Sequence, residues 1–398
     1  MASNNNQAVI YLDIVNYSVH YYAMADGKIT HDTRNLTARP FTQEYFTKLM
    51  DIVTDFVSKY TPANAANTTI VLPDNVIFTN LTTFPALKGN ELKNTLDTYL
   101  TTAFTNLDKL KIVTYNAIMN KQFVTVCFAG VINDIIAETK RTCTEARLIA
   151  NNVTFASNTV ASALNNLSGK YKNETYMFLD IKNGFSRYIF VYKGKVVGFF
   201  SLPFGYEILV PNKMAAEDVL LYTPSAELLV INAKEKAKQK ALTMSSAAVT
   251  QVEEESDEES GDLETSFSSE DSSQPKTQDF TIKTLPKKVA RKLPKFMVRE
   301  VPEEDERKVY ENFRLFLKWT LDLLNSNDKI VSLGKPENIY VNLPSEFDYL
   351  FDIINEEVED NGIKFVSAGL NKEKEEVKQN LELYGGFFLK DYKQSTNF

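Results

Sequence analysis

A strand, turn and strand pattern occurs twice in this sequence, and it constrains the fold more than any other feature. Residues 9–29 align without a gap on residues 176–196, at a constant offset of 167. Seven of the 21 aligned positions are identical: Leu12/Leu179, Asp13/Asp180, Ile14/Ile181, Asn16/Asn183, Tyr21/Tyr188, Gly27/Gly194 and Lys28/Lys195. A unit repeated at a fixed offset indicates a duplicated architecture, although short hairpins can also resemble one another by chance. We therefore expect two related halves with a cleft between them.

Hydrophobic periodicity between the two hairpins alternates between strands and helices. Residues 42–59 place apolar side chains at spacings of three and four, as in an amphipathic helix, and a short apolar strand follows at 69–72. Residues 92–104 and 132–144 are predicted helices, and 123–128 is a predicted strand. This alternation is typical of an α/β domain built on a central sheet.

The acidity of the chain belongs to one segment. The formal net charge is −8, and the stretch 253–271 alone carries ten Asp and Glu residues with no Lys or Arg. The rest of the chain is then −8 + 10 = +2. Low hydrophobicity and high charge predict a disordered linker over 241–295, acidic first and basic afterwards. The basic run is a candidate contact for an anionic partner, but a solvated linker end is the preferred interpretation, so nucleic-acid binding is not expected.

The cysteine and histidine counts limit the possible chemistry. Two cysteines and two histidines exclude a disulfide framework and zinc-finger ligand spacing, so we expect no metal site. A reducing compartment fits these counts, and we identify neither a signal peptide nor a membrane span, so a cytoplasmic protein is expected. Cys143, with acidic neighbours on its predicted helix, is expected to be an unreactive, at least half-buried thiol. His20 aligns on Arg187, and both are expected on the surface.

The two hairpins and the stretch between them resemble the PilM and FtsA branch of the actin-like ATPase superfamily. In that superfamily each half begins with a hairpin whose Asp-bearing turn approaches the phosphates of a bound nucleotide. Residues 70–104 have the order of a strand, Leu-Pro, a strand closing on Phe-Pro, and a helix, and this order is similar to the subdomain inserted in PilM, a type IV pilus assembly protein. The resemblance implies an α/β actin-like ATPase fold with two duplicated halves and a small inserted α+β subdomain in the first half.

The resemblance also implies domain boundaries. The first half would comprise 1–66 and 140–170, the inserted subdomain 67–139, and the second half 171–240 and 296–398, with the linker 241–295 inside it. A groove beside the inserted subdomain would receive a short peptide of an inner-membrane partner. Its candidate residues are Val76, Phe78, Leu81 and Phe84, which are alternatively core residues.

Three loops that contain glycine in active superfamily members are altered here. Val15 occupies the glycine position of the first turn, Lys182 that of the second, and residues 342–344 read Asn-Leu-Pro where a double glycine would contact adenosine. Bulky side chains disfavour positive φ and keep the backbone away from phosphate. The residues left to hold ATP and magnesium are Asp13, Asn16, Ser18, Asp180, Asn183, Gly184 and Ser186, for which ordinary turn chemistry is the competing interpretation.

These observations predict a pseudo-ATPase with no catalytic residues. It would bind no cofactor, or ATP with magnesium if binding is retained. The predicted role is a cytoplasmic scaffold of a type IV pilus or related envelope machine, recruited to the inner face of the membrane by its partner, with self-association possible. The alternatives are an FtsA-like cell-division or cytoskeletal ATP-binding protein and an active small-molecule kinase of the same superfamily.

Overall fold

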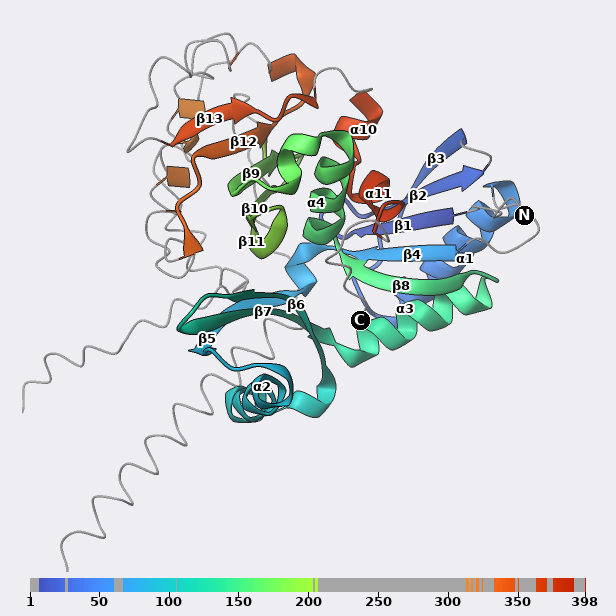
Figure 1. The fold of residues 1–398 in the computed structure, drawn as a ribbon. Helices are drawn as coiled ribbons and strands as arrows, with labels where there is room; N and C mark the ends of the chain where they lie inside the picture. Colours follow the sequence, from blue (N-terminus) through green and yellow to red (C-terminus); the bar gives the residue numbers. More distant parts are fainter. Residues whose placement is uncertain are drawn as a thin grey trace, which may run out of the picture.

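The computed structural model describes a three-sheet α/β molecule (Figure 1). It describes residues 7–25, 28–60, 67–104, 106–202, 205–206, 333–347, 363–370, 375–389 and 398, and isolated positions between 313 and 350. The predicted acidic and basic linker, 241–295, lies outside the described residues.

Two five-stranded sheets repeat one topology. The first has the order β3-β2-β1-β4-β8, and the second the order β11-β10-β9-β12-β13. In the first half these strands are β1 (Gln7–Asp13), β2 (Ser18–Ala25), β3 (Lys28–Asn35), β4 (Asn67–Leu72) and β8 (Ile149–Phe155). In the second they are β9 (Tyr176–Ile181), β10 (Ser186–Tyr192), β11 (Lys195–Leu202), β12 (Asn338–Asn342) and β13 (Lys364–Ser367). Each sheet has an antiparallel meander followed by two parallel strands. The predicted duplicated α/β architecture is therefore confirmed.

The strand register corrects the gapless alignment of the two hairpins. Asp13 lies opposite Ser18, and residues 14–17 connect them. Asp180 lies opposite Arg187, and a further pair, Ile181 and Ser186, precedes the turn at 182–185. The structural counterpart of Arg187 is thus Ser18 and not His20. The expectation that Arg187 lies on the surface is wrong, because it occupies a strand buried on both faces and is 1% exposed.

Two helices cover one face of the first sheet. The helix α1 (Gln43–Tyr60) buries Tyr45, Phe46, Leu49, Val53 and Phe56 and packs on β2, β3 and the helix α3 (Asn133–Glu145). The Thr42 hydroxyl accepts a hydrogen bond from the Tyr45 amide at 3.3 Å, the geometry of an N-cap. Both helices therefore agree with the predicted periodicity.

A third sheet, of order β5-β7-β6, is inserted in the first half. It consists of β5 (Phe78–Pro85), β6 (Leu110–Met119) and β7 (Phe123–Ile132), with the helix α2 (Gly89–Ala103) on one face. Because β4 pairs in the first sheet, this separate sheet begins at Phe78 and not at the predicted boundary, 67. The Tyr115 hydroxyl donates a hydrogen bond to the Val197 carbonyl at 3.0 Å, and the Asn116 side-chain amide donates one to the Val196 carbonyl at 3.2 Å. The inserted sheet is therefore held against β11 of the second half.

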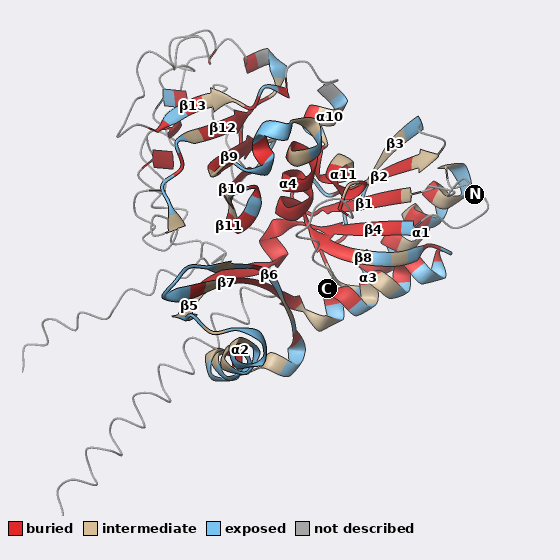
Figure 2. Ribbon diagram, viewed as in Figure 1, coloured by how far each residue is buried: buried red, intermediate tan, exposed pale blue. Residues whose placement is uncertain are grey.

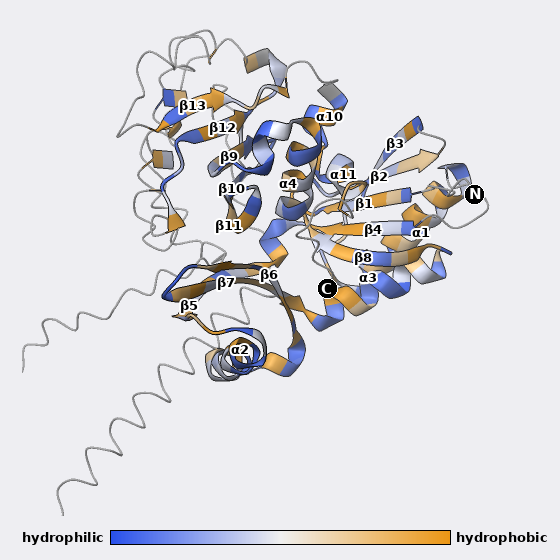
Figure 3. Ribbon diagram, viewed as in Figure 1, coloured by the Kyte–Doolittle hydropathy of each residue, from blue (hydrophilic) through white to orange (hydrophobic). Residues whose placement is uncertain are grey.

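The helices α4 (Ala156–Leu167) and α11 (Leu381–Gly386) lie between the two large sheets (Figure 1). Figure 2 shows α4 buried over most of its length, although Figure 3 shows hydrophilic positions on it. Gly385 allows α11 to approach α4, because a Cβ there would lie 1.7 Å from the Thr159 carbonyl oxygen. This contact brings the C-terminal part of the chain back against the first half.

The other helical elements whose bounds the structure describes are short. Single 3-10 turns occur at Asp74–Val76 (η1), Leu107–Lys109 (η2), Gly169–Lys172 (η3) and Ser345–Phe347 (η7), and α10 (Glu375–Gln379) precedes α11. No described helix is long and apolar enough to cross a membrane. The turns η1 and η7 each follow a Leu-Pro pair after the fourth strand of their sheet, so the duplication extends beyond the hairpins.

Candidate functional site

Four central strands end where the two halves meet, at a junction that the chain's own side chains fill and that we call the crevice. The strands β1 and β4 run parallel, as do β9 and β12, and their carboxyl ends carry Asp13, Asp74, Asp180 and Asn342. In open α/β sheets, ligands bind outside the carboxyl ends of strands. This crevice is therefore the place where a nucleotide site would be sought.

The first hairpin turn binds its own aspartate. The Asp13 carboxylate accepts hydrogen bonds from the Val15 and Asn16 amides, both at 3.0 Å, and from the Asn16 side-chain amide at 2.8 Å. Backbone amides are the groups with which a turn cradles phosphate. Here these two amides are already used inside the turn.

The second hairpin turn contacts the first directly. The Asn16 side-chain amide donates to the Asn183 carbonyl at 3.4 Å. Gly184 has φ +76°, and a Cβ built on it would lie 3.2 Å from Cγ1 of Val15. Val15 therefore fills space between the turns, where a glycine would have left room.

Arg187 is the centre of a buried charge cluster. Its Nε donates to Asp74 Oδ2, and its Nη1 to Asp180 Oδ2 at 3.1 Å and to Glu382 Oε1 at 2.7 Å. All four side chains are at most 3% exposed. Burial opposes the Arg187 charge, but the carboxylates of Glu382 and Asp74 outweigh it and raise the Arg187 pKa well above its ordinary value.

Glu382 reaches the crevice from α11. Its Oε2 accepts a charge-assisted hydrogen bond from Lys182 Nζ at 3.1 Å, while its Oε1 binds Arg187. Burial alone would raise the Glu382 pKa, but Lys182 and Arg187 reverse the effect and lower it to about 2. In contrast, burial raises the pKa of Asp74 and of Asp180 despite their cationic neighbours. Glu382 is thus the most firmly ionised of the three carboxylates.

The third altered loop, residues 342–344, also forms hydrogen bonds with other parts of the chain. The Asn342 side-chain amide donates to Asp180 Oδ1 at 2.8 Å and to the Lys378 carbonyl at 3.2 Å. Lys378, 3% exposed, donates from Nζ to Ser345 Oγ at 3.1 Å. The segment Glu376–Glu382 therefore lies across the ends of β9 and β12.

The structure brings most of the predicted nucleotide-site residues together. Asp13, Asn16, Asn183 and Gly184 surround the contact between the turns, and Asp180 joins the charge cluster. Ser18 lies at the start of β2, with Oγ 2.9 Å from His20 Nε2, and Ser186 is fully buried at the start of β10. These residues do not form a cradle fitted to ATP and magnesium, because the first turn's amides and the two cations already have protein partners.

Sequence reasoning missed Arg187, Asp74 and Glu382. Arg187 could have been recognised as a charged residue within an otherwise apolar strand. Asp74 was signalled by the repeated Leu-Pro pair. Asp74 follows this pair in the first half, and Ser345 follows it in the second. For Glu382 no local signal exists, since it lies 195 residues from Arg187 along the chain.

The candidate partner-binding residues lie in different environments. Phe78 packs under α2 with Phe104 and Phe128, whereas Leu81 and Val76 belong to the main core. All three are buried. Phe84 is half-buried, with its ring 5.9 Å from that of Tyr99 on α2. Of the four, Phe84 has the most exposed side chain.

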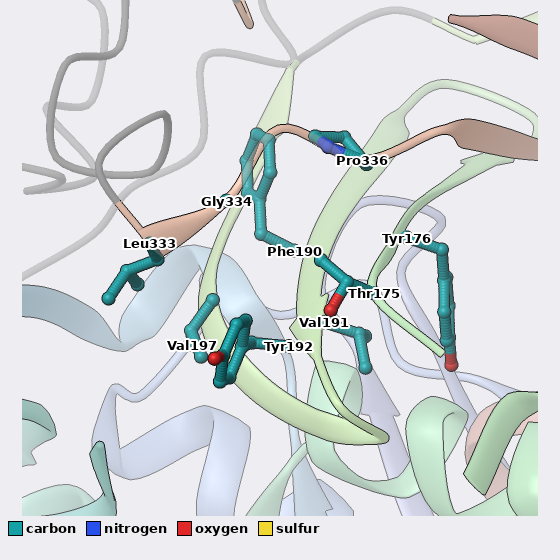
Figure 4. Close-up of a pocket in the computed structure, with 9 residues that line it drawn as sticks. All are labelled: Thr175, Tyr176, Phe190, Val191, Tyr192, Val197, Leu333, Gly334 and Pro336. Carbon is teal, nitrogen blue, oxygen red and sulfur yellow. The ribbon is translucent and has the colours of Figure 1, made fainter. Parts of the chain in front are cut away.

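A small hollow lies at the opposite end of the second sheet (Figure 4). It holds about 10 Å³, room for about one water molecule, between Tyr176, Phe190, Tyr192 and the segment Leu333–Pro336. Its lining is mainly apolar, and it is remote from both hairpin turns. It does not have the size of a nucleotide pocket.

The described residues offer little other chemistry. Among them, no group of three or more His, Cys, Asp or Glu could hold a metal ion. Cys143 is buried, and burial raises its thiol pKa to about 12, as expected for an unreactive side chain.

Comparison with solved structures identifies the fold. A PilM-PilN type IV pilus biogenesis complex aligns over 96% of this chain and 98% of its own, with a TM-score of 0.52 and 10% sequence identity. This chain has the actin-like ATPase fold, in the form seen in PilM.

Two further structures are similar at lower TM-scores. The ethanolamine utilization protein EutJ of Carboxydothermus hydrogenoformans has a TM-score of 0.38 at 10% identity, over 96% of this chain and 89% of its own. A Bacteroides thetaiotaomicron protein with an actin-like ATPase fold has a TM-score of 0.31 at 12% identity, over 52% and 73%. No protein-family description and no curated protein matches the sequence.

Proposed function

We propose that this protein is a non-catalytic scaffold of a type IV pilus or related envelope assembly machine. The observation that carries the proposal is the alignment with the PilM-PilN complex along nearly the whole of both chains. In this proposal the protein is cytoplasmic and is recruited to the inner face of the membrane by an inner-membrane partner.

The partner would bind through a short peptide at the inserted subdomain. In the described part of the chain β5 pairs only with β7, so β5 forms one edge of the three-stranded sheet. An extended peptide can add to such an edge through backbone hydrogen bonds, with side-chain pockets providing specificity. Thr83 and Pro85 are exposed on β5, and Phe84 lies beside them against Tyr99. The proposed contact is therefore the outer end of β5.

Absence of ATP turnover is the second part of the proposal. Two turn amides are bound to Asp13, and Lys182 and Arg187 are bound to Glu382. Hydrolysis would require these groups to be released and the two turns to separate.

Peptide binding tests the scaffold role. Synthetic peptides covering the cytoplasmic tails of the inner-membrane pilus proteins from the same organism would be titrated by fluorescence anisotropy. We expect one tail to bind the wild type, and Phe84→Ala to weaken it about tenfold, equivalent to about 1.4 kcal/mol.

Ile149→Ala is the matched control. Ile149 is an exposed apolar residue on β8, 58% exposed and outside the inserted sheet, so its loss should leave the affinity unchanged. If no tail binds the wild type, or if both variants weaken binding equally, the proposed site is wrong.

A further inference from the structure

We propose that the segment Glu376–Glu382 is a built-in ligand of the crevice, and that the Glu382 carboxylate occupies an oxyanion site formed by Lys182 and Arg187. This inference does not depend on the proposed partner. It concerns which group fills the place where a related fold would hold a phosphate.

The first argument is the geometry of the two cations. Lys182 lies in the second hairpin turn, and Arg187 follows that turn on β10. Glu382 offers one oxygen to each of them, Oε1 to Arg187 Nη1 at 2.7 Å and Oε2 to Lys182 Nζ at 3.1 Å. One anion bridging an arginine and a lysine is also how proteins bind phosphate groups.

The second argument is the distribution of the other carboxylates. Asp74 accepts from the Ser157 amide at 2.8 Å and from its hydroxyl at 2.9 Å, at the first turn of α4. Asp180 accepts from the Asn342 side chain. These two carboxylates are anchored to the halves, whereas Glu382 comes from a separate segment that lies over the crevice. Glu382 is therefore the member of the cluster that an external anion could replace.

The third argument is the way in which the segment is fastened. At one end, the Tyr22 hydroxyl lies 3.4 Å from Glu376 Oε1. In the middle, the Lys378 carbonyl accepts from Asn342, and the Gln379 carbonyl accepts from Lys182. At the other end, α11 packs against α4 and β1. The contacts extend from strand β2 of the first half to strand β12 of the second, so the segment also joins the halves.

Removing the Glu382 carboxylate tests the site directly. In Glu382→Ala, the buried Arg187 and the partly buried Lys182 lose an anion, so the melting temperature should fall. Inorganic phosphate or pyrophosphate at millimolar concentration should then raise it by about 2 °C or more. The wild type should show no such rise beyond that produced by matched ionic strength. The double variant Glu382→Ala/Lys182→Ala should lose the phosphate response.

Glu376→Ala is the control within the same segment. Glu376 contacts Tyr22 and His31, whereas Lys182 and Arg187 bind Glu382, so the loss of Glu376 should create no phosphate response. If Glu382→Ala does not fold, Glu382→Gln provides the same test, because it keeps the shape and removes the charge. The inference is overturned if folded Glu382 variants show no phosphate response, or if the wild type responds as strongly as they do.

Discussion

Arg187 binds carboxylates from three separate parts of the chain: Asp74 of the first half, Asp180 of the second and Glu382 of α11. Removing one partner of a buried ion pair leaves the others buried and uncompensated, at a cost of about 3–5 kcal/mol. We expect Arg187→Ala to lower the free energy of unfolding by about that amount, as measured by urea denaturation.

An exposed arginine provides the comparison. Arg141 pairs with Glu138 and Glu145 on the surface of α3, where such ion pairs contribute about 0–1 kcal/mol. Arg141→Ala should therefore change stability little. Equal losses in the two variants would contradict the structural importance of the buried cluster.

The two histidines predict how stability depends on pH. The rings of His20 and His31 stack with centroids 6.2 Å apart, and the Thr33 hydroxyl lies within hydrogen-bond distance of both. Burial lowers the pKa of each below the ordinary value of 6.5, although Asp13 and Glu382 act in the opposite direction on His20, and Glu376 and Asp32 on His31.

A lowered histidine pKa means that the unfolded chain binds the proton more readily than the folded chain. The contribution of the neutral histidines to the free energy of unfolding is thus complete above pH 6.5, and it is lost as the pH falls below 6.5. We expect the urea midpoint to decrease between pH 7.5 and 5.5, and to decrease less in His20→Gln/His31→Gln. The same decrease in both proteins would show that the histidines are not responsible.

At the scale of elements, the docking of α11 depends on a residue without a side chain. A Cβ at Gly385 would lie 1.7 Å from a backbone oxygen of α4, so one of the helices would have to move. Overpacking of this kind costs about 1–3 kcal/mol or more. We expect Gly385→Ala to destabilise the protein and to increase amide exchange in α11 and the segment before it.

Gly169→Ala is a suitable control, because a Cβ at Gly169 meets nothing within 4 Å and its φ is not positive. It should leave both stability and exchange near the wild-type values. Exchange in α11 that is unchanged by Gly385→Ala would contradict the close packing described here.

Sequence reasoning predicted the elements better than their contacts. The helix at 42–59 and the two hairpins follow from hydrophobic periodicity, which depends on neighbours along the chain. Periodicity does not show to which sheet β4 belongs, since a short apolar strand suits either sheet. For that reason the predicted start of the inserted subdomain, residue 67, differs from the start of the inserted sheet. The register of the second hairpin also escaped prediction, because a gapless alignment cannot detect that its strands pair one residue beyond Asp180, and this placed Arg187 incorrectly.

At the scale of the whole molecule, three sets of contacts join the two halves. The hairpin turns touch through Asn16 and Asn183, and the C-terminal segment crosses the ends of the central strands. The inserted sheet adds a further connection through Tyr115 and Asn116 to β11. Together these three connections favour one fixed arrangement of the halves.

Isothermal titration of the wild-type protein with ATP and magnesium tests the central claim most directly. With the turn amides bound to Asp13 and the two cations bound to Glu382, we predict no saturable heat of binding at millimolar ATP. Saturable binding with a micromolar dissociation constant would contradict the claim that the crevice is filled by the protein's own C-terminal segment.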